Sequence, residues 1–326
     1  MAANRPVSVA PLLDALTAHQ MITRIEREVR QVILGKDDVI RLAVTCLVAG
    51  GHLLVEDVPG VGKTTLARTL AKVTTGSFRR IQFTSDLLPS DIVGVAVYDQ
   101  TAQEFRFHPG PVFANVLLAD EINRATPKTQ SALLEAMSDR QVTVEGQTRP
   151  LPDPFLVVAT QNPLEIVGTY PLPESQLDRF LMRVVMGYPA PEAELQLMAG
   201  HSNEDALRQV SQACSTTDMV ALRRTVGTVR VEDSLLSYVH TLVQRTRQSS
   251  VFSIGASPRG AMSLVLAARA RALAEARDYC VPDDVQRCFL PVLAHRLHPP
   301  GGMPEDGRAY SEDALRRILS SVPVPT

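Results

Sequence analysis

The sequence predicts an α/β domain built on a parallel sheet, followed by a smaller all-helical lid domain. Four short apolar runs have the length and residue types of buried strands, and helices can be assigned between them. These runs are residues 53–55, 80–83, 116–119 and 155–159. After a proline-containing segment at 188–191, helical patterns dominate, apart from short pieces such as 229–231. We therefore expect two domains, residues 1–188 and 189–326.

Helices and turns surround these strands in a regular order. Residues 12–31 and 39–48 have apolar positions at helical spacing, so the first 31 residues form a helical N-terminal part. Two β-hairpins interrupt the alternation of strands and helices, and each lies just upstream of a strand that ends in polar residues. They pair 93–98 with 104–108 and 141–145 with 148–151. The helices expected in the second domain are 192–200, 217–226, 233–249, 258–278, 282–297 and 312–320.

Composition narrows the functional classes. The formal net charge of the 326-residue chain is −2, so no global positive charge attracts nucleic acid or anionic lipid. Aromatic residues make up 5% and tryptophan is absent, which disfavours a broad stacking platform for single strands.

Cysteine usage and hydropathy indicate the cellular compartment in which the protein is expected. The four cysteines lack metal-ligand spacing and are interpreted as core thiols in a reducing environment. No signal peptide is apparent, and the longest apolar stretch, 42–55, is too interrupted to span a bilayer. We expect a soluble, cytoplasmic protein without membrane insertion.

A glycine-rich turn connects the first predicted strand to a helix. Its sequence is DVPGVGKT, from Asp57 to Thr64. Backbone N–H groups in such a turn surround phosphate oxygens, Lys63 adds a positive charge, and the Thr64 hydroxyl is a ligand for Mg²⁺. The general pattern has glycine where this chain has Asp57, and a chance Gly-Lys-Thr on a surface turn is the alternative. The strand before the turn and the helix after it favour a nucleotide-binding loop.

Two carboxylates follow the apolar run 116–119. At the carboxyl end of a strand, Asp120 is expected to hold the Mg²⁺ shell and Glu121 to polarise a water for attack on the γ-phosphate. An Asp-Glu pair after apolar residues is by itself often a solvated helix start. Its place downstream of the glycine-rich turn predicts ATP hydrolysis.

Three further residues fit around the γ-phosphate. Asn162 ends another predicted strand and is expected to orient the attacking water. Arg179, on a predicted short helix, is expected to act across a subunit boundary, with a surface Asp–Arg pair as the alternative. Arg259 follows Ser257 and Pro258, which suit the start of a long helix, and is either directed to the nucleotide or solvent-exposed.

These motifs, in this order and with a helical lid, resemble the AAA+ ATPases. Four segments make the resemblance closer: LVEDVPGVGKT (54–64), DEINRA (120–125), QNP (161–163) and LPESQLDRFL (172–181). Together they are similar to the MoxR family, in which an acidic or other residue often stands at the position of Asp57. The resemblance covers nearly the whole chain and implies a P-loop AAA+ core with two inserted hairpins.

The resemblance also assigns roles to individual residues. ATP and Mg²⁺ are the implied cofactors, with Asn162 as first sensor, Arg179 as arginine finger and Arg259 as second sensor. The implied nucleotide-binding residues are Pro59, Gly60, Val61, Gly62, Lys63, Thr64, Thr65 and, for the adenine, Val32, Ile33 and Gly35. Arg124 is assigned either to a neighbouring subunit or to helix capping.

The same resemblance implies a homo-oligomeric ring, usually a hexamer, and chaperone-like maturation of a protein complex. A partner with a von Willebrand factor A domain is part of that expectation. One alternative is a nucleic-acid motor or chelatase-like subunit, kept open by Arg140 and Arg149 on the second hairpin. The other is a kinase that uses the same loop, although no acceptor site is apparent in the sequence.

Overall fold

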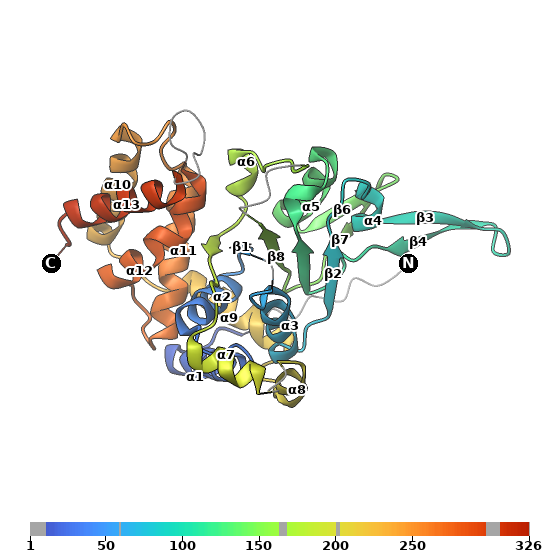
Figure 1. Cartoon of the computed structure of the whole chain (residues 1–326), viewed down its shortest axis with the longest axis horizontal. Helices are drawn as coiled ribbons and strands as arrows, with labels where there is room; N and C mark the ends of the chain where they lie inside the picture. The colour runs from blue at the N-terminus through green and yellow to red at the C-terminus, as the bar shows by residue number, and fades with distance from the viewer. Residues whose placement is uncertain (1–10, 59, 163–167, 200–202, 298–306, 326) are drawn as a thin grey trace.

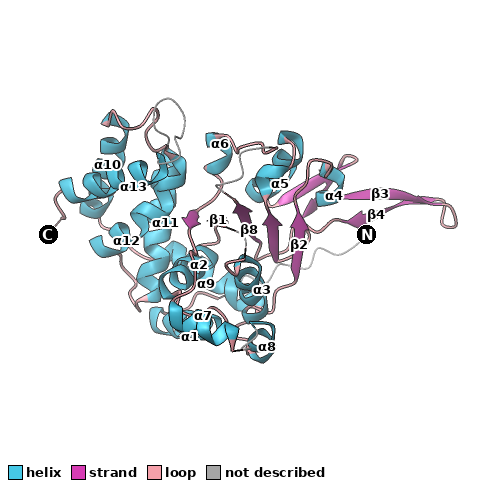
Figure 2. Ribbon diagram, viewed as in Figure 1, coloured by secondary structure: helices cyan, strands magenta, loops and turns pink. Residues whose placement is uncertain are grey.

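The computed structural model describes residues 11–58, 60–162, 168–199, 203–297 and 307–325. Its centre is a five-stranded parallel sheet with the order β2-β5-β8-β1-β9 (Figure 2). The strands are β1 (Leu53–Glu56), β2 (Phe78–Gln82), β5 (Val116–Asp120), β8 (Leu156–Gln161) and β9 (Met182–Val184). Every residue of β1, β5 and β8 is buried, as expected for the central strands of a parallel sheet covered on both faces. The α/β prediction is therefore confirmed.

The strand β9 is the one member of this sheet that the sequence did not predict. It is three residues long and has an arginine at its centre. Arg183 is nevertheless buried, because Glu56 lies 2.9 Å from its guanidinium and Glu312 also pairs with it. The counter-charges come from 127 and 129 residues away, so the local pattern carries no sign of a buried strand.

Helices of the N-terminal part of the chain pack around the sheet. α1 and α2 correspond to the predictions at 12–31 and 39–48, and α3 follows the glycine-rich turn. The set is α1 (Ala15–Arg30), α2 (Asp37–Val48), α3 (Lys63–Val73), α4 (Pro89–Val93), α5 (Pro127–Asp139) and α6 (Glu174–Leu177). All four cysteines are free and buried, as expected, and burial raises the pKa of the Cys288 thiol to about 12.

Both predicted hairpins are present. β3 (Gly94–Asp99) pairs with β4 (Glu104–Pro109), and β6 (Gln141–Val144) pairs with β7 (Gln147–Pro150). The β3–β4 hairpin projects from the body of the molecule (Figure 1). It carries exposed apolar side chains, among them Val97 and Phe105.

The C-terminal part is helical, as predicted. Its helices are α7 (Pro191–Met198), α8 (Asn203–Gln209), α9 (Thr216–Thr228), α10 (Asp233–Gln248), α11 (Pro258–Ala274), α12 (Pro282–Leu293) and α13 (Gly307–Ser321). The expected helix 282–297 divides into α12 and the 3₁₀ turn η2 (Ala294–Arg296). The segment between α8 and α9 contacts the core, since the Ala213 N–H donates to Val73 O at 2.8 Å. The boundary at residue 188 stays a prediction.

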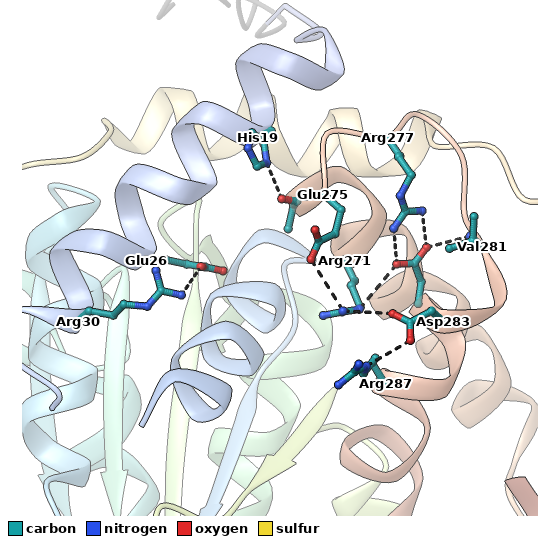
Figure 3. Close-up of polar contacts among 11 residues, drawn as sticks. His19, Glu26, Arg30, Arg271, Glu275, Arg277, Val281, Asp283 and Arg287 are labelled. Atoms are coloured by element: carbon teal, nitrogen blue, oxygen red, sulfur yellow. Dashed lines mark hydrogen bonds and ion pairs between the residues drawn. The ribbon is translucent and has the colours of Figure 1, made fainter. Parts of the chain in front are cut away.

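A polar contact connects α1 to the lid helix α11 (Figure 3). His19 Nδ1 on α1 donates to Ala274 O at the end of α11, at 2.6 Å. Within the lid, Arg277 makes two bonds of 2.7 Å to the buried carboxylate of Asp284. No helix of the described ranges has the length and apolarity needed to cross a membrane.

Candidate active site

Three predicted site segments meet at one edge of the sheet. β5, β8 and β1 are adjacent and parallel, so their carboxyl ends lie side by side (Figure 2). The glycine-rich turn leaves β1, where the Asp57 N–H donates to Gln161 O at the end of β8, at 3.1 Å. Asp120 ends β5 and Glu121 follows it, while Asn162 follows β8 as a buried residue. An open α/β sheet binds its ligands at this edge.

The turn is shaped to accept an anion. Gly60 and Gly62 have φ angles of +88° and +97°, which residues with a Cβ rarely adopt, and a Cβ built on Gly60 would meet no atom within 4 Å. α3 begins at Lys63 without a side-chain cap, and Leu66 N makes the first helical bond, to Gly62 O. The preceding N–H groups are therefore available to phosphate oxygens. Pro59 lies outside the described residues.

The residues after the turn also favour binding of an anion. Lys63 is buried and its Nζ donates to Asp57 O at 2.9 Å, which holds the ammonium group at the start of the turn. Thr64 and Thr65 are half-buried in the first turn of α3. The positive end of the helix dipole adds to the attraction for negative charge.

The structure explains why an aspartate occupies the first position of the turn. Asp57 is 7% exposed, and its two carboxylate oxygens accept from the N–H groups of Val58 at 2.8 Å and Gly187 at 2.5 Å. Gly187 lies between β9 and α7, in the segment that leads to the lid, and Lys36 donates to the carbonyl of Tyr188 beside it. The carboxylate thus fixes the turn to the connection between core and lid, a role that glycine cannot perform.

Thr160 organises the two acidic residues, although no sequence pattern pointed to it. Its hydroxyl is fully buried, donates to Asp120 Oδ1 at 2.6 Å and accepts from the Glu121 N–H at 2.8 Å. Glu121 has a φ of +56°, so the chain turns sharply at this point.

Side chains from neighbouring segments make polar contacts with both carboxylates of the acidic pair. Arg80 of β2 lies 2.6 Å from Asp120 Oδ2. Glu121 Oε2 accepts from Gln82 at 2.7 Å and from Arg124 at 2.9 Å. Arg124 therefore contacts Glu121 of its own chain.

The oxygen ligands at this edge suit a hard cation. The Asp120 carboxylate and the Thr64 hydroxyl are the residues that would hold Mg²⁺ together with phosphate oxygens of the nucleotide. Among the described residues, no group of three or more His, Cys, Asp or Glu side chains is arranged as a metal site. Two protein oxygens plus phosphates fit Mg²⁺, which seldom uses a cage made of protein alone.

A small pocket lies beside the turn, where the adenine was expected. Val32 and Ile33 line it together with Val61 and Gly62. Gly35 is not among its lining residues, and its positive φ instead lets the chain turn beside Ala193 of α7. Residues that the sequence did not suggest complete the lining: Leu34, Lys36, Met186, Pro189, Ala193 and Asn203.

The two predicted arginines lie apart from this cluster. Arg179 is not on a helix as predicted, because α6 ends at Leu177, and its Nη1 donates to Leu134 O on α5 at 2.7 Å and to Ser138. Arg259 is exposed in the first turn of α11, with no polar partner in the described part of the chain. Ser257 caps that helix, as predicted, by accepting from Gly260 N at 3.0 Å.

Comparisons with known proteins agree with this geometry. The family described as "ATPase family associated with various cellular activities (AAA)" matches residues 52–182, and the AAA lid domain matches residues 244–318. The YeaC protein of Bacillus subtilis is 47% identical over 94% of this chain and 96% of its own. Chaperone MoxR1 of Mycobacterium tuberculosis is 43% identical over 91% of this chain and 81% of its own. The chain belongs to the MoxR family of AAA+ ATPases.

A solved structure extends the likeness to the whole MoxR-family fold. The crystal structure of a protein from Cytophaga hutchinsonii has a TM-score of 0.87 and 39% identity, and covers 96% of this chain and 97% of its own. The P-loop AAA+ core with a helical lid is thereby confirmed. As a MoxR-family AAA+ protein, the chain binds ATP and is an ATPase.

Proposed function

We propose that this MoxR-family chain uses Mg²⁺-dependent ATP hydrolysis to remodel or mature a protein complex, as a subunit of a hexameric ring. The observation that carries the proposal is the convergence of the P-loop, the Asp120–Glu121 pair and the end of β8 at one edge of the sheet. Its chemistry follows from the groups that meet there.

Each residue at this edge has a proposed part in phosphoryl transfer. Loop N–H groups and Lys63 hold the phosphates, and Glu121 accepts the proton of a water that attacks the γ-phosphorus while ADP departs. Asn162 orients that water. Mg²⁺, when bound, neutralises charge on the phosphate oxygens. In the structure Gln82 and Arg124 both donate to Oε2 of Glu121, which holds one oxygen of its carboxylate in place.

The position of Arg179 supports action on a neighbouring subunit. Its hydrogen bonds are made to α5, and no contact with the P-loop or the acidic pair is present within the described chain. An arginine that stabilises the transferring phosphoryl group must approach the γ-phosphate closely. A ring of subunits supplies such an approach from the next molecule, while Arg259 of the lid acts on the chain's own nucleotide.

The remodelling role rests on relatives and on exposed surface. One relative is a chaperone by name, and the other MoxR proteins align over most of this chain. The β3–β4 hairpin presents Val97 at 49% and Phe105 at 66% exposure, an apolar surface suited to contact with a protein. We propose that the chain is cytoplasmic, that it acts on a protein client, and that a partner with a von Willebrand factor A domain takes part.

The structure weakens the support for a nucleic-acid motor. Of the two arginines that suggested one, Arg149 lies 4.0 Å from the centre of the Phe107 ring and donates to Gln147. The other, Arg140, donates to Gly50 O and lies 3.8 Å from Asp153. Both guanidinium groups therefore make contacts within the chain. Salt-sensitive stimulation of ATPase activity by DNA would reinstate the motor.

The proposal is tested with two variants and their mixtures. Glu121→Gln should bind ATP yet lose at least a hundredfold in kcat, because the amide cannot accept the proton of the water. Arg179→Ala rings should also be nearly inactive. Rings mixed from the two variants should recover activity, since some sites then combine an intact Glu121 with a neighbour's Arg179.

Two outcomes would overturn the proposal. Absence of recovery at every mixing ratio would refute a site shared between subunits. A strictly monomeric protein in the presence of ATP and Mg²⁺, measured by light scattering, would favour the kinase alternative. A pull-down with the Glu121→Gln variant in its ATP-bound form then identifies the client.

A further inference from the structure

A buried ion pair joins the end of the α/β core to the lid. Asp178 directly precedes Arg179, and its Oδ1 lies 2.8 Å from Nε of Arg296 in the turn η2. The Arg296 side chain is 3% exposed and that of Asp178 is 19% exposed. Removing two charges from water in this way costs desolvation free energy. Further hydrogen bonds are therefore needed to stabilise the pair.

The surrounding contacts supply that support. Arg296 Nη2 donates to Phe180 O at 2.7 Å and to Ser263 of α11 at 3.2 Å, while Nη1 donates to Val292 O at 2.6 Å. His295 makes a second bond to Phe180 O, at 3.0 Å. The turn that carries Arg179 is thus bonded through its backbone to two consecutive residues of the lid. Burial lowers the pKa of Arg296 to about 10, and the charge of nearby Arg259 adds to the shift while Asp178 opposes it.

The second oxygen of Asp178 reaches the helix that carries Arg259. Ser257 donates its hydroxyl hydrogen to Asp178 Oδ2 at 2.9 Å, and the same hydroxyl oxygen accepts from Gly260 N to cap α11. A Cβ at Gly260 would lie 3.5 Å from Arg296 Cδ, which shows how closely the start of α11 packs on the arginine. One carboxylate therefore contacts both η2 and the N-cap residue of α11.

We propose that Asp178, together with Ser257 and Arg296, is a positioning group that couples the lid to Arg179. When the lid moves over a subunit's own ATP, these residues transmit the movement to Arg179, which that subunit presents to its neighbour. The proposal rests on the ring-forming function proposed above. When Arg259 engages ATP, α11 shifts with it, and the Ser257–Asp178 contact carries that shift to the residue next to Arg179. The state of one site then controls catalysis in the next one.

The alternative is that Asp178 serves stability alone. A structural role would make Asp178 and Ser257 variants less stable but would leave communication between sites unchanged. The distinguishing quantity is the cooperativity of ATP hydrolysis, together with the response of the Arg179 segment to ATP.

Ser257→Ala is the decisive variant, because it removes the contact to α11 and leaves the Asp178–Arg296 pair in place. Ser215→Ala is its matched control. Ser215 caps α9 in the same manner, accepting from Asp218 N at 3.1 Å and donating to the Asp218 carboxylate at 2.7 Å, with no link to the Arg179 segment. Both variants lose one serine cap and one bond to a carboxylate.

The first measurement is ATPase rate against ATP concentration in assembled rings. We expect Ser257→Ala to lower the Hill coefficient toward 1 and kcat about tenfold, with ATP affinity within threefold of the wild type. Ser215→Ala should retain wild-type values. Asp178→Asn should reproduce the Ser257→Ala effect, and if circular dichroism shows that it fails to fold, Ser257→Ala carries the test.

The second measurement is hydrogen exchange of residues 177–181 in the Glu121→Gln background, which holds ATP without turnover. ATP should slow or speed exchange in this segment in the parent, and Ser257→Ala should abolish that response. Wild-type cooperativity together with an intact exchange response in Ser257→Ala would overturn the inference. Failure of the Arg179→Ala and Glu121→Gln mixtures to recover activity would instead refute the shared site itself, so the two failures can be told apart.

Discussion

Replacing Thr160 by valine tests how the acidic pair is held. Valine has almost the same shape, so the change removes the hydroxyl from a fully buried site and leaves no cavity. Two hydrogen bonds are lost: the 2.6 Å bond donated to Asp120 and the 2.8 Å bond accepted from the Glu121 N–H.

The size of the effect follows from these two bonds. A hydrogen bond to a charged group contributes about 1.5–3 kcal/mol, and a buried N–H left without an acceptor costs about 1–3 kcal/mol. Because the two losses share one site, we expect the free energy of unfolding to fall by about 3 kcal/mol. Asp120 and the backbone of Glu121 also lose their alignment. Because of this, we expect kcat to fall about a hundredfold.

Urea unfolding gives the stability change, and steady-state ATPase measurements give kcat and KM. Thr160→Ser retains the hydroxyl and should restore most of the activity. Thr225→Val is the matched control, because the Thr225 hydroxyl likewise donates to one oxygen, Ala221 O, and accepts from one backbone N–H, that of Leu13. That variant should lose stability without a specific loss in kcat.

An unchanged kcat in a folded Thr160→Val variant would refute the reasoning. So would an equal fall in kcat in Thr225→Val, because the loss would then reflect general destabilisation.

Two further predictions concern buried groups outside the acidic pair. Asp57→Gly restores the glycine of the general loop pattern but removes the hydrogen bonds from Val58 and Gly187. We expect the free energy of unfolding, measured by urea unfolding, to fall by about 2–4 kcal/mol. We also expect weaker ATP binding, measured by calorimetry. Unchanged stability and affinity would contradict the proposed link between turn and lid. Burial lowers the pKa of His52 to about 3, and its Nδ1 accepts from Val157 N. The unfolded chain therefore binds more protons between pH 6.5 and 3, so stability should fall by up to about 1.4 kcal/mol per pH unit below 6.5. His52→Gln should flatten this part of the pH profile.

The hairpins and most helices could be predicted because their signals are local. Gly146-Gln147 between alternating residues predicted β6 and β7, and Ser257-Pro258 predicted the start of α11. The end of α6 before Arg179 could not be predicted, because the side chain of Asp178 is held by Ser257 and Arg296 of the lid.

What the sequence determined by itself was the chemistry of each segment: a strand, a glycine-rich turn and a helix with Lys63 and Thr64, and two carboxylates after an apolar strand. These patterns depend on neighbours within a few residues. Only the tertiary structure decided which groups meet. Arg183 could be buried in β9, Asp57 could hold Gly187, and Thr160 could hold Asp120, because partners 40 to 130 residues apart are brought within hydrogen-bond distance by the parallel sheet and the lid.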